Sequence, residues 1–259
     1  MLHEKTLQAE IIPEPSDQEV ADPISITPNR SWYLGGKLVL DWIVTMLLAV
    51  MLAPLILLLA ALVKLTSPGP AFYRQVRLGQ NKRPFSIYKL RTMTQNCEAT
   101  TGPVWSNAND PRVTRIGRFL RDTHLDELPQ LWNVLRGEMS LIGPRPERPE
   151  LVARLERLIP HYADRLQLRP GLTGLAQVQL PADSDVSDVR RKLSHDLYYL
   201  RELSLGLDLR ILICTLFHLA SLCLNSVGRL FVRSCAKAVE NQLETSPYLG
   251  GETRQVKTA

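Results

Sequence analysis

The sequence predicts a predominantly helical α+β fold with one membrane segment, and three observations support this. A long apolar run covers Leu38–Val63. A two-strand signal follows it between residues 71 and 92. Segments with helical spacing of apolar residues and many basic side chains occupy most of the remaining chain. We therefore expect a membrane helix, a small β-hairpin and amphipathic helices that lie at the membrane surface.

The two ends of the chain have the composition of solvated tails. Residues 1–30 contain several prolines and acids without a sustained apolar period, so we expect a disordered N-terminal tail. They also lack the pattern of a signal peptide. Residues 236–259 are expected to form a C-terminal tail. Between the tails we expect a membrane segment over 31–66 and one domain over 67–235.

Composition favours an anionic partner and a reducing compartment. The chain carries 31 basic and 26 acidic residues, a net charge of +5, and many of the acids lie in the N-terminal tail. The body is therefore more basic than the total, which favours phospholipid, nucleotide or nucleic acid as a partner. The four cysteines form no C-x-x-C pair and have no histidines at zinc spacing, so neither a disulfide framework nor a zinc site is expected.

The apolar run is broken only by Asp41 and Thr45. As a straight helix it would measure about 39 Å, enough to cross the hydrocarbon core. However, Pro54 lies in its middle, and basic residues, among them Lys37 and Lys64, flank it on both sides. A helix that breaks at the proline and returns to the same side explains both features. A crossing helix with a tolerated proline is the alternative, and the residues alone do not separate the two.

A β-hairpin is predicted next, with strands over Ala71–Arg77 and Pro84–Thr92 and a turn over Gly79–Lys82. Alternation along the second strand places Lys89 and Arg91 side by side on one face. Such a pair can contact phosphates or form a solvated cationic edge.

Asp110-Pro111 predicts the start of a helix, with the aspartate as its cap. Basic residues then recur at every third position: Arg112, Arg115, Arg118 and Arg121. This row can be a solvated face, can lie along lipid headgroups, or can direct Arg121 toward Asp126.

An adjacent pair of acids, Asp126 and Glu127, opens the next predicted helix, which is capped by Thr123 or Asp126 and ends at Gly137. The helix macrodipole favours the ionised carboxylates there. An ionised aspartate is a competent nucleophile toward phosphorus, and a second carboxylate can bind a metal ion or transfer a proton. Acids at this position are also ordinary helix caps, so both interpretations stand.

Two proline-braced arginine loops follow, Gly143–Glu147 around Arg145 and Arg169–Gly174. Each proline restricts itself and the residue before it, so little entropy is lost when such an arginine binds a phosphate. Further helices are expected near residues 151–159, 185–203 and 207–227. Together with the acid pair, the loops indicate phosphate chemistry at a membrane.

The ordered motifs resemble the bacterial sugar transferases, also called monotopic phosphoglycosyl transferases or polyprenyl-phosphate sugar-1-phosphate transferases. The resemblance runs from about Lys37 to Leu216. The motifs that carry it are Lys64-Leu-Thr-Ser-Pro-Gly-Pro-Ala-Phe-Tyr-Arg-Gln75, Phe85-Ser-Ile-Tyr-Lys-Leu-Arg-Thr-Met93, Asp110-Pro-Arg-Val-Thr-Arg-Ile-Gly117, Leu125-Asp-Glu-Leu-Pro-Gln-Leu131, Gly143-Pro-Arg-Pro146, Arg169-Pro-Gly-Leu-Thr-Gly174 and Asp196-Leu-Tyr-Tyr199.

The resemblance implies an enzyme that transfers a sugar 1-phosphate from a UDP-sugar to undecaprenyl phosphate, or another polyprenyl phosphate, and releases UMP. It assigns Asp126 as the nucleophile that forms a phosphosugar intermediate, Glu127 as its partner, and both as ligands of Mg²⁺. Pro54 matches the break of a re-entrant helix. The implied substrate- and phosphate-binding residues are Lys89, Arg91, Arg121, Arg145, Arg169 and Asp196.

The implied partners are the UDP-sugar donor, the polyprenyl phosphate acceptor and membrane lipids, with no nucleic acid; a homodimer is compatible with the sequence. The implied place is the bacterial inner membrane, with the catalytic domain of residues 67–235 on its cytoplasmic face, and the implied pathway is exopolysaccharide, O-antigen or glycoconjugate synthesis. One departure concerns Gln179-Leu180-Pro181, where many members have Asn-Gly-Arg. Nothing in the sequence indicates which sugar is carried. The alternatives are a membrane phosphohydrolase and a non-enzymatic scaffold that binds anionic lipids or RNA.

Overall fold

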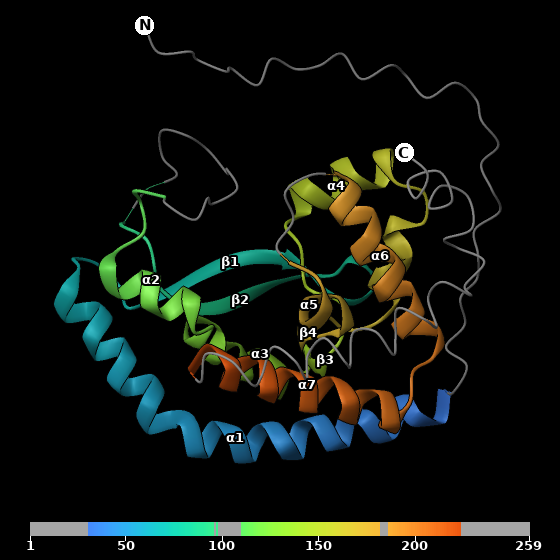
Figure 1. The fold of residues 1–259 in the computed structure, drawn as a ribbon, viewed down its shortest axis with the longest axis horizontal. Coiled ribbons are helices and arrows are strands. Elements are labelled where there is room, and N and C mark those ends of the chain that lie inside the picture. The colour runs from blue at the N-terminus through green and yellow to red at the C-terminus, as the bar shows by residue number, and fades with distance from the viewer. Residues whose placement is uncertain (1–30, 96, 98–109, 182–185, 224–259) are drawn as a thin grey trace, which may run out of the picture.

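Helices pack around a small parallel sheet and against one side of a β-hairpin in the computed structural model, which describes residues 31–95, 97, 110–181 and 186–223 (Figure 1). This confirms the predominantly helical α+β class. The expected tails, 1–30 and 236–259, lie outside the described residues. The elements are α1 Ser31–Thr66, β1 Phe72–Leu78, η1 Gln80–Lys82, β2 Pro84–Leu90, α2 Arg115–Asp122, η2 Leu125–Gln130, α3 Leu131–Leu135, β3 Ser140–Ile142, α4 Pro149–Leu158, η3 Tyr162–Gln167, β4 Gly171–Thr173, α5 Leu175–Gln179, α6 Val186–Arg201 and α7 Leu205–Cys223.

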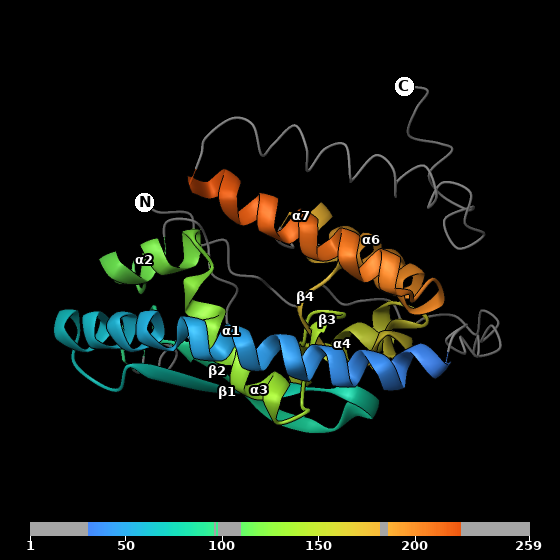
Figure 2. The same cartoon turned by 90° about the horizontal axis from the view of Figure 1, so that it is seen from below.

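The apolar segment forms one helix, α1, that continues through Pro54. Proline lacks the N–H that would donate to the preceding turn, and its ring crowds a carbonyl of that turn. A helix that continues through a proline is therefore bent at that point. Figure 1 shows α1 changing direction along its length, whereas the helix looks nearly straight in Figure 2. The expected break at Pro54 is therefore wrong: the helix is bent but not interrupted.

Within the described part of the chain, α1 is the one helix long and apolar enough to cross a membrane, over Tyr33–Thr66, and its most apolar 18 residues have a mean hydropathy of 2.9. Only 17% of its most apolar stretch is buried against the rest of the protein. The core helix of a soluble domain would be mostly covered, so the exposed apolar face of α1 is available for lipid.

Both ends of α1 make contacts with the domain that follows it (the body). Near its start, Nζ of Lys37 lies 2.7 Å from a carboxylate oxygen of Asp208 in α7. Just past its end, Arg91 donates to the carbonyl oxygens of Ser67 and Pro68 at 2.8 and 2.6 Å. In Figure 2 the β1–β2 hairpin lies on one side of α1, and α6 and α7 lie on the other.

The predicted hairpin is confirmed: β1 and β2 pair antiparallel, with Phe72 opposite Leu90 and Leu78 opposite Pro84. Asn81 and Lys82 in the connection have φ angles of 53° and 60°, the left-handed region that turn residues adopt. Below the hairpin, Asn133 of α3 accepts a hydrogen bond from the Tyr88 N–H at 3.2 Å. Its amide also donates to the Ser86 carbonyl at 2.7 Å, so one side chain ties β2 to α3.

A second sheet was not predicted. Its strands β3 and β4 run parallel, with Ser140 opposite Gly171 and Ile142 opposite Thr173. The two segments approach each other so closely that a Cβ at Gly171 would overlap the backbone nitrogen of Gly143. Because β3 leads into the loop Gly143–Glu147 and β4 lies within the loop Arg169–Gly174, this pairing places the two loops side by side.

The start of α2 differs from the prediction. The helix begins at Arg115, where the Thr114 hydroxyl accepts a hydrogen bond from the Gly117 N–H at 2.9 Å. Asp110 instead accepts hydrogen bonds from the backbone and guanidinium of Arg112. Asp110 therefore does not cap the helix, and Thr114 is the N-cap residue instead.

Candidate active site

The acid pair lies on a 3₁₀ turn, η2 (Leu125–Gln130), that leads directly into the α-helix α3. The turn begins after His124, whose φ of 56° is left-handed and whose side chain makes no cap bond. The expected caps, Thr123 or Asp126, are therefore wrong. In an α-helix the ring of Pro129 would crowd the carbonyl of Leu125, four residues earlier, which disfavours α-helical geometry in this turn. The predicted end is confirmed at Gly137, which has a φ of 73°.

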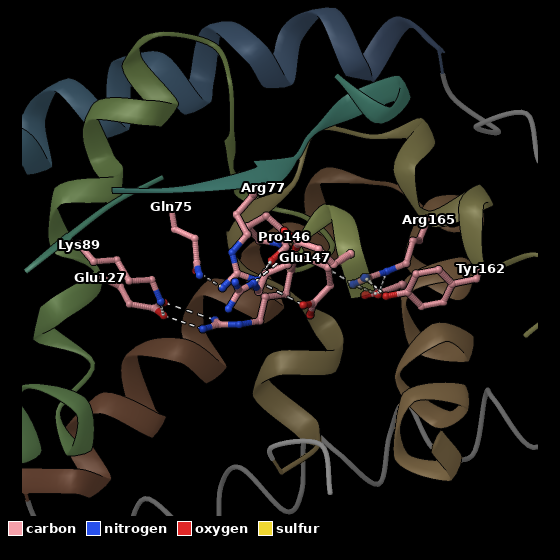
Figure 3. Close-up of polar contacts among 12 residues, drawn as sticks. Gln75, Arg77, Lys89, Glu127, Pro146, Glu147, Tyr162 and Arg165 are labelled. Carbon is pink, nitrogen blue, oxygen red and sulfur yellow. Dashed lines mark hydrogen bonds and ion pairs between the residues drawn. The ribbon is translucent and has the colours of Figure 1, made fainter. Parts of the chain in front are cut away.

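Glu127 is held by two cations from different parts of the chain (Figure 3). Its Oε1 lies 2.7 Å from Nζ of Lys89 and 2.6 Å from Nη2 of Arg145. Burial raises the pKa of Glu127, but the charges and hydrogen bonds of Arg145 and Lys89 outweigh it and hold this pKa well below its usual range. Glu127 is therefore ionised at every physiological pH.

Asp126 has the opposite electrostatic character. Burial raises its pKa to about 6; the charge of Lys89 opposes this and the charge of Glu127 adds to it. The Asp126 residue is only 7% exposed. Two adjacent carboxyls whose pKa values move apart are a common property of acid–base and nucleophilic sites. Near neutral pH Asp126 is mostly ionised but poorly solvated, which suits a nucleophile.

The backbone of Arg145 is fixed by its loop, and its side chain pairs with Glu127 while part of it stays open to solvent. The loop that carries it is tied to β4 by the Gly143 N–H donating to the Thr173 carbonyl at 2.9 Å. The Gly171 N–H donates to Pro144 at 2.9 Å, and Arg77 of β1 donates to the Pro146 carbonyl at 3.3 Å. The Arg145 side chain nevertheless remains 45% exposed. A guanidinium held this way can contact Glu127 and an incoming anion.

The other predicted phosphate-binding residues are distributed differently. Lys89 and Arg91 do not act side by side, because β2 ends at Leu90 and Arg91 turns to the end of α1. Nε of Arg121 donates to the Thr92 hydroxyl at 2.8 Å, and its charge lowers the pKa of Asp126.

Arg169 and Asp196 contact other residues than the acid pair. A Cβ at Gly137 would stand 3.3 Å from Nη1 of Arg169, so this guanidinium covers the end of α3. Asp196 in α6 is 2% exposed and accepts a hydrogen bond from Arg165 at 2.8 Å. The structure thus brings Asp126, Glu127, Lys89, Arg121 and Arg145 together. The substrate roles of Arg91, Arg169 and Asp196 stay predictions.

Sequence reasoning missed a buried polar cluster between α1, β3, α6 and α7. Asp208 accepts hydrogen bonds from the Tyr33 hydroxyl at 2.9 Å and the Tyr199 hydroxyl at 2.7 Å, and it pairs with Lys37. Asp41 accepts from the Ser140 hydroxyl of β3. Charged residues within apolar runs were the available signal, because burying them is costly unless they are paired.

Among the residues that the structure describes, no three or more histidines, cysteines or acids are grouped to hold a metal ion. The carboxylates of the candidate site are those of Asp126 and Glu127.

Comparison with known proteins identifies the family. A sequence model described as bacterial sugar transferase matches residues 32–221. The UDP-glucose:undecaprenyl-phosphate glucose-1-phosphate transferase of Caulobacter vibrioides is 48% identical over 183 residues, which cover 69% of this chain and 67% of that protein.

Two other relatives are similar. The UDP-N-acetylgalactosamine-undecaprenyl-phosphate N-acetylgalactosaminephosphotransferase of Aeromonas hydrophila is 47% identical over 63% of this chain, which spans only 38% of that protein's length. The exopolysaccharide production protein PSS of Rhizobium leguminosarum is 43% identical over 63% of this chain and 84% of its own length. The family match covers most of the described residues, from α1 to α7, and includes the acid pair and both arginine loops. This chain belongs to the bacterial sugar transferase family.

Proposed function

We propose that this protein transfers a sugar 1-phosphate from a UDP-sugar to undecaprenyl phosphate, an early membrane step of polysaccharide synthesis. Family membership and the activities for which the relatives are named support this reaction. The observation that carries it is the pairing of Asp126, with a raised pKa, and Glu127, with a lowered one, next to Lys89 and the exposed Arg145. This arrangement provides a nucleophile and fixed positive charge for a diphosphate.

The proposed reaction has two steps. The Asp126 carboxylate attacks the phosphorus that bears the sugar, forming an aspartyl–phosphosugar bond while the bond to the UMP oxygen breaks and UMP leaves. A phosphate oxygen of undecaprenyl phosphate then attacks the same phosphorus, and the bond to the Asp126 oxygen breaks. Covalent catalysis of this kind divides one difficult displacement into two easier ones. Lys89 and Arg145 stabilise the charge on the phosphate oxygens.

Magnesium fits this donor set. Mg²⁺ commonly takes one or two protein carboxylates and completes its shell with substrate phosphates and water, so a larger acidic cluster is not required. Asp126 and Glu127 would hold it, and it would neutralise charge on the diphosphate. The cations already on Glu127 keep its carboxylate ionised without the metal. We therefore include Mg²⁺ in the proposal.

We also propose that α1 is re-entrant and that the catalytic body lies on the cytoplasmic face of the inner membrane. The long apolar helix and the lipid-linked substrates named for the relatives indicate a membrane protein. The support for re-entry is that Lys37 near one end and Ser67 just past the other are both fixed to the same body. A helix that crossed the bilayer would place these ends on opposite sides.

The sugar is not determined by overall similarity. Two relatives of nearly equal identity are named for different sugars, glucose in one case and N-acetylgalactosamine in the other. We propose that the segment Gln179-Leu180-Pro181, at the end of α5, affects contact with the donor. A panel of UDP-sugars, tested with the wild type and with Gln179→Asn/Leu180→Gly/Pro181→Arg, examines this. An unchanged preference and rate in the variant would contradict it.

The experiment that tests the main proposal is product analysis. Purified protein in bilayer nanodiscs is incubated with UDP-sugar and Mg²⁺, with and without undecaprenyl phosphate. We expect sustained UMP release and a lipid diphosphate sugar only with the acceptor present. Sustained release of free sugar phosphate without acceptor would indicate a phosphohydrolase instead. Lipid binding without any turnover, unaffected by Asp126→Ala/Glu127→Ala, would indicate a scaffold.

A further inference from the structure

Arg145 is held at two points that face opposite ways. Its side chain reaches Glu127, whereas its backbone carbonyl accepts a hydrogen bond from Nη2 of Arg165 at 3.0 Å. In Figure 3, Glu127 lies on one side of the Pro146–Glu147 segment, and Arg165 and Tyr162 lie on the other. Arg145, which pairs with Glu127 through its side chain, is therefore held at its carbonyl by Arg165.

Arg165 is itself fully engaged and buried. Asp196 accepts from its Nε at 2.8 Å and lies 2.7 Å from its Nη2, and the Tyr162 hydroxyl accepts from its Nη1 at 3.0 Å. The side chains of Arg165 and Asp196 are only 7% and 3% exposed. The planar guanidinium fork can serve three acceptors in one fixed geometry, which a lysine cannot do.

Stability alone is a weak explanation for this pair. Removing two charges from water costs several kcal/mol each, and well-packed apolar residues of similar volume are often as stable or more so. What the charged pair adds here is direction, because it aims a donor at one particular carbonyl. The loop already has backbone bonds to β4 and a bond from Arg77 to Pro146. The bond from Arg165, in contrast, is made to the backbone carbonyl of Arg145.

We propose that Arg165 and Asp196 are positioning residues that set the place of Arg145 relative to Glu127 and the donor phosphates. This inference rests on the proposed transferase function. It also assigns Asp196 a role different from the substrate contact expected from sequence: Asp196 orients Arg165, and Arg165 holds the Arg145 carbonyl. Neither side chain touches substrate.

The first experiment separates positioning from folding. Asp196→Asn removes one charge and leaves Arg165 buried without a full partner, so it lowers the melting temperature. Arg165→Met/Asp196→Leu removes both charges, so it should recover a melting temperature near that of the wild type. It nevertheless leaves the Arg145 carbonyl unsupported. We expect its kcat to fall about 100-fold, as for a small misplacement at a reacting centre, while the donor KM changes less than about threefold.

A matched control uses a more exposed ion pair of α6, the helix that carries Asp196: Arg191, with a side chain 56% exposed, lies 2.8 Å from Asp188, with a side chain 16% exposed. Arg191→Met/Asp188→Leu should leave kcat within about twofold of the wild type. If Arg165→Met/Asp196→Leu cannot be folded, Arg165→Lys is the second variant, because lysine can reach Asp196 but lacks the fork. Per folded enzyme, Arg165→Lys should lose about tenfold in kcat; a wild-type rate would overturn the proposal.

The second experiment asks whether the pair acts through Arg145. In an Arg145→Ala background, Arg165→Met/Asp196→Leu should cause no further loss of kcat, because the group it positions is gone. Losses that multiply, or a double variant that keeps kcat within twofold of the wild type, would overturn the inference. A wild-type protein without turnover would contradict the proposed function itself, and with it the inference that rests on that function.

Discussion

Nη2 of Arg145 lies 2.6 Å from Oε1 of Glu127, and the same carboxylate oxygen lies 2.7 Å from Nζ of Lys89. Two cations therefore share one oxygen of the second acid, while the first acid, Asp126, keeps a raised pKa. Glu127 gathers the positive charge that a diphosphate needs, and Asp126 remains available for attack.

Asp126→Asn should abolish formation of the covalent intermediate. The wild type, incubated with UDP-sugar alone, should release about one equivalent of UMP and gain a sugar-phosphate adduct on the Asp126 peptide, detectable by mass spectrometry. The variant keeps the shape of the side chain but loses the nucleophile, so turnover should fall about 1000-fold or more. Glu127→Gln should slow the reaction without moving the adduct. Full turnover by Asp126→Asn, after deamidation is excluded, would refute the mechanism.

The first half-reaction should depend on the ionisation of Asp126. Because its pKa is raised to about 6, the rate of UMP release should rise with pH through about 6 and reach a plateau above about 7. Glu127 stays ionised over this range and should add no second inflection. Stopped-flow release with donor alone is the suitable measurement, since it excludes titration of the acceptor phosphate. A rate independent of pH between 5 and 7 (roughly one unit on each side of this pKa) would contradict the assignment.

Neutralising the two acids should change stability in opposite directions. Asp126 has a raised pKa in the folded state, so the folded protein binds more protons between pH 4 and 6 and ionised Asp126 disfavours folding at higher pH. Asp126→Asn should therefore stabilise the protein at pH 7.5, by up to about 3 kcal/mol, and the gain should vanish below about pH 4, where the acid is protonated in both states.

Ionised Glu127, in contrast, should stabilise the folded state. Its pKa is lowered in the folded state, so its contribution is present above the unfolded value and is lost as pH falls through the folded one. Glu127→Gln should cost roughly 1–3 kcal/mol at pH 7.5, because it leaves Lys89 and Arg145 facing each other without an anion. Thermal unfolding of both variants in the same detergent checks the pair. Equal shifts of the same sign would contradict the proposed electrostatics.

The cluster around Asp208 should be essential for attaching α1 to the body. Lys37→Met leaves two buried carboxylates, Asp41 and Asp208, without their cation, and should cost about 3–5 kcal/mol. Lys37→Met/Asp208→Asn should recover part of this loss. An exposed pair gives the control: Arg201 lies 3.8 Å from Glu202, and Arg201→Met should change stability by less than about 0.5 kcal/mol. Equal losses from Lys37→Met and Arg201→Met would show that the cluster is not an anchor.

Labelling tests the placement of α1 in the membrane. In a cysteine-free background, cysteines introduced at Gly35 and Thr66 lie at the two ends of the helix, and a side chain at Gly35 meets no neighbour within 4 Å. A membrane-impermeant maleimide should modify both from the cytoplasmic side in inverted vesicles and neither in intact spheroplasts. Modification of the two sites from opposite sides would show that α1 crosses the bilayer.

Local features of the fold could be read from the chain because their causes are local. The turn at Gly79–Lys82, the end of α3 at Gly137 and the stiffness of the Arg145 loop depend on residues within one turn of each other. The start of η2 at His124 could not be read this way, since no cap residue marks it. The strands β3 and β4 were missed because each has three residues and becomes a strand only when its distant partner is beside it.

The sequence by itself determined the fold class, the candidate acids and the family, because these depend on residue type, spacing and order along the chain. The tertiary structure alone decided which cation meets which acid: Lys89 and Arg145 on Glu127, Arg91 at the end of α1, and Arg165 on Asp196. The reason is physical. Ion pairing and pKa shifts depend on distance and on removal from water, and both are set by segments far apart in sequence that burial brings together.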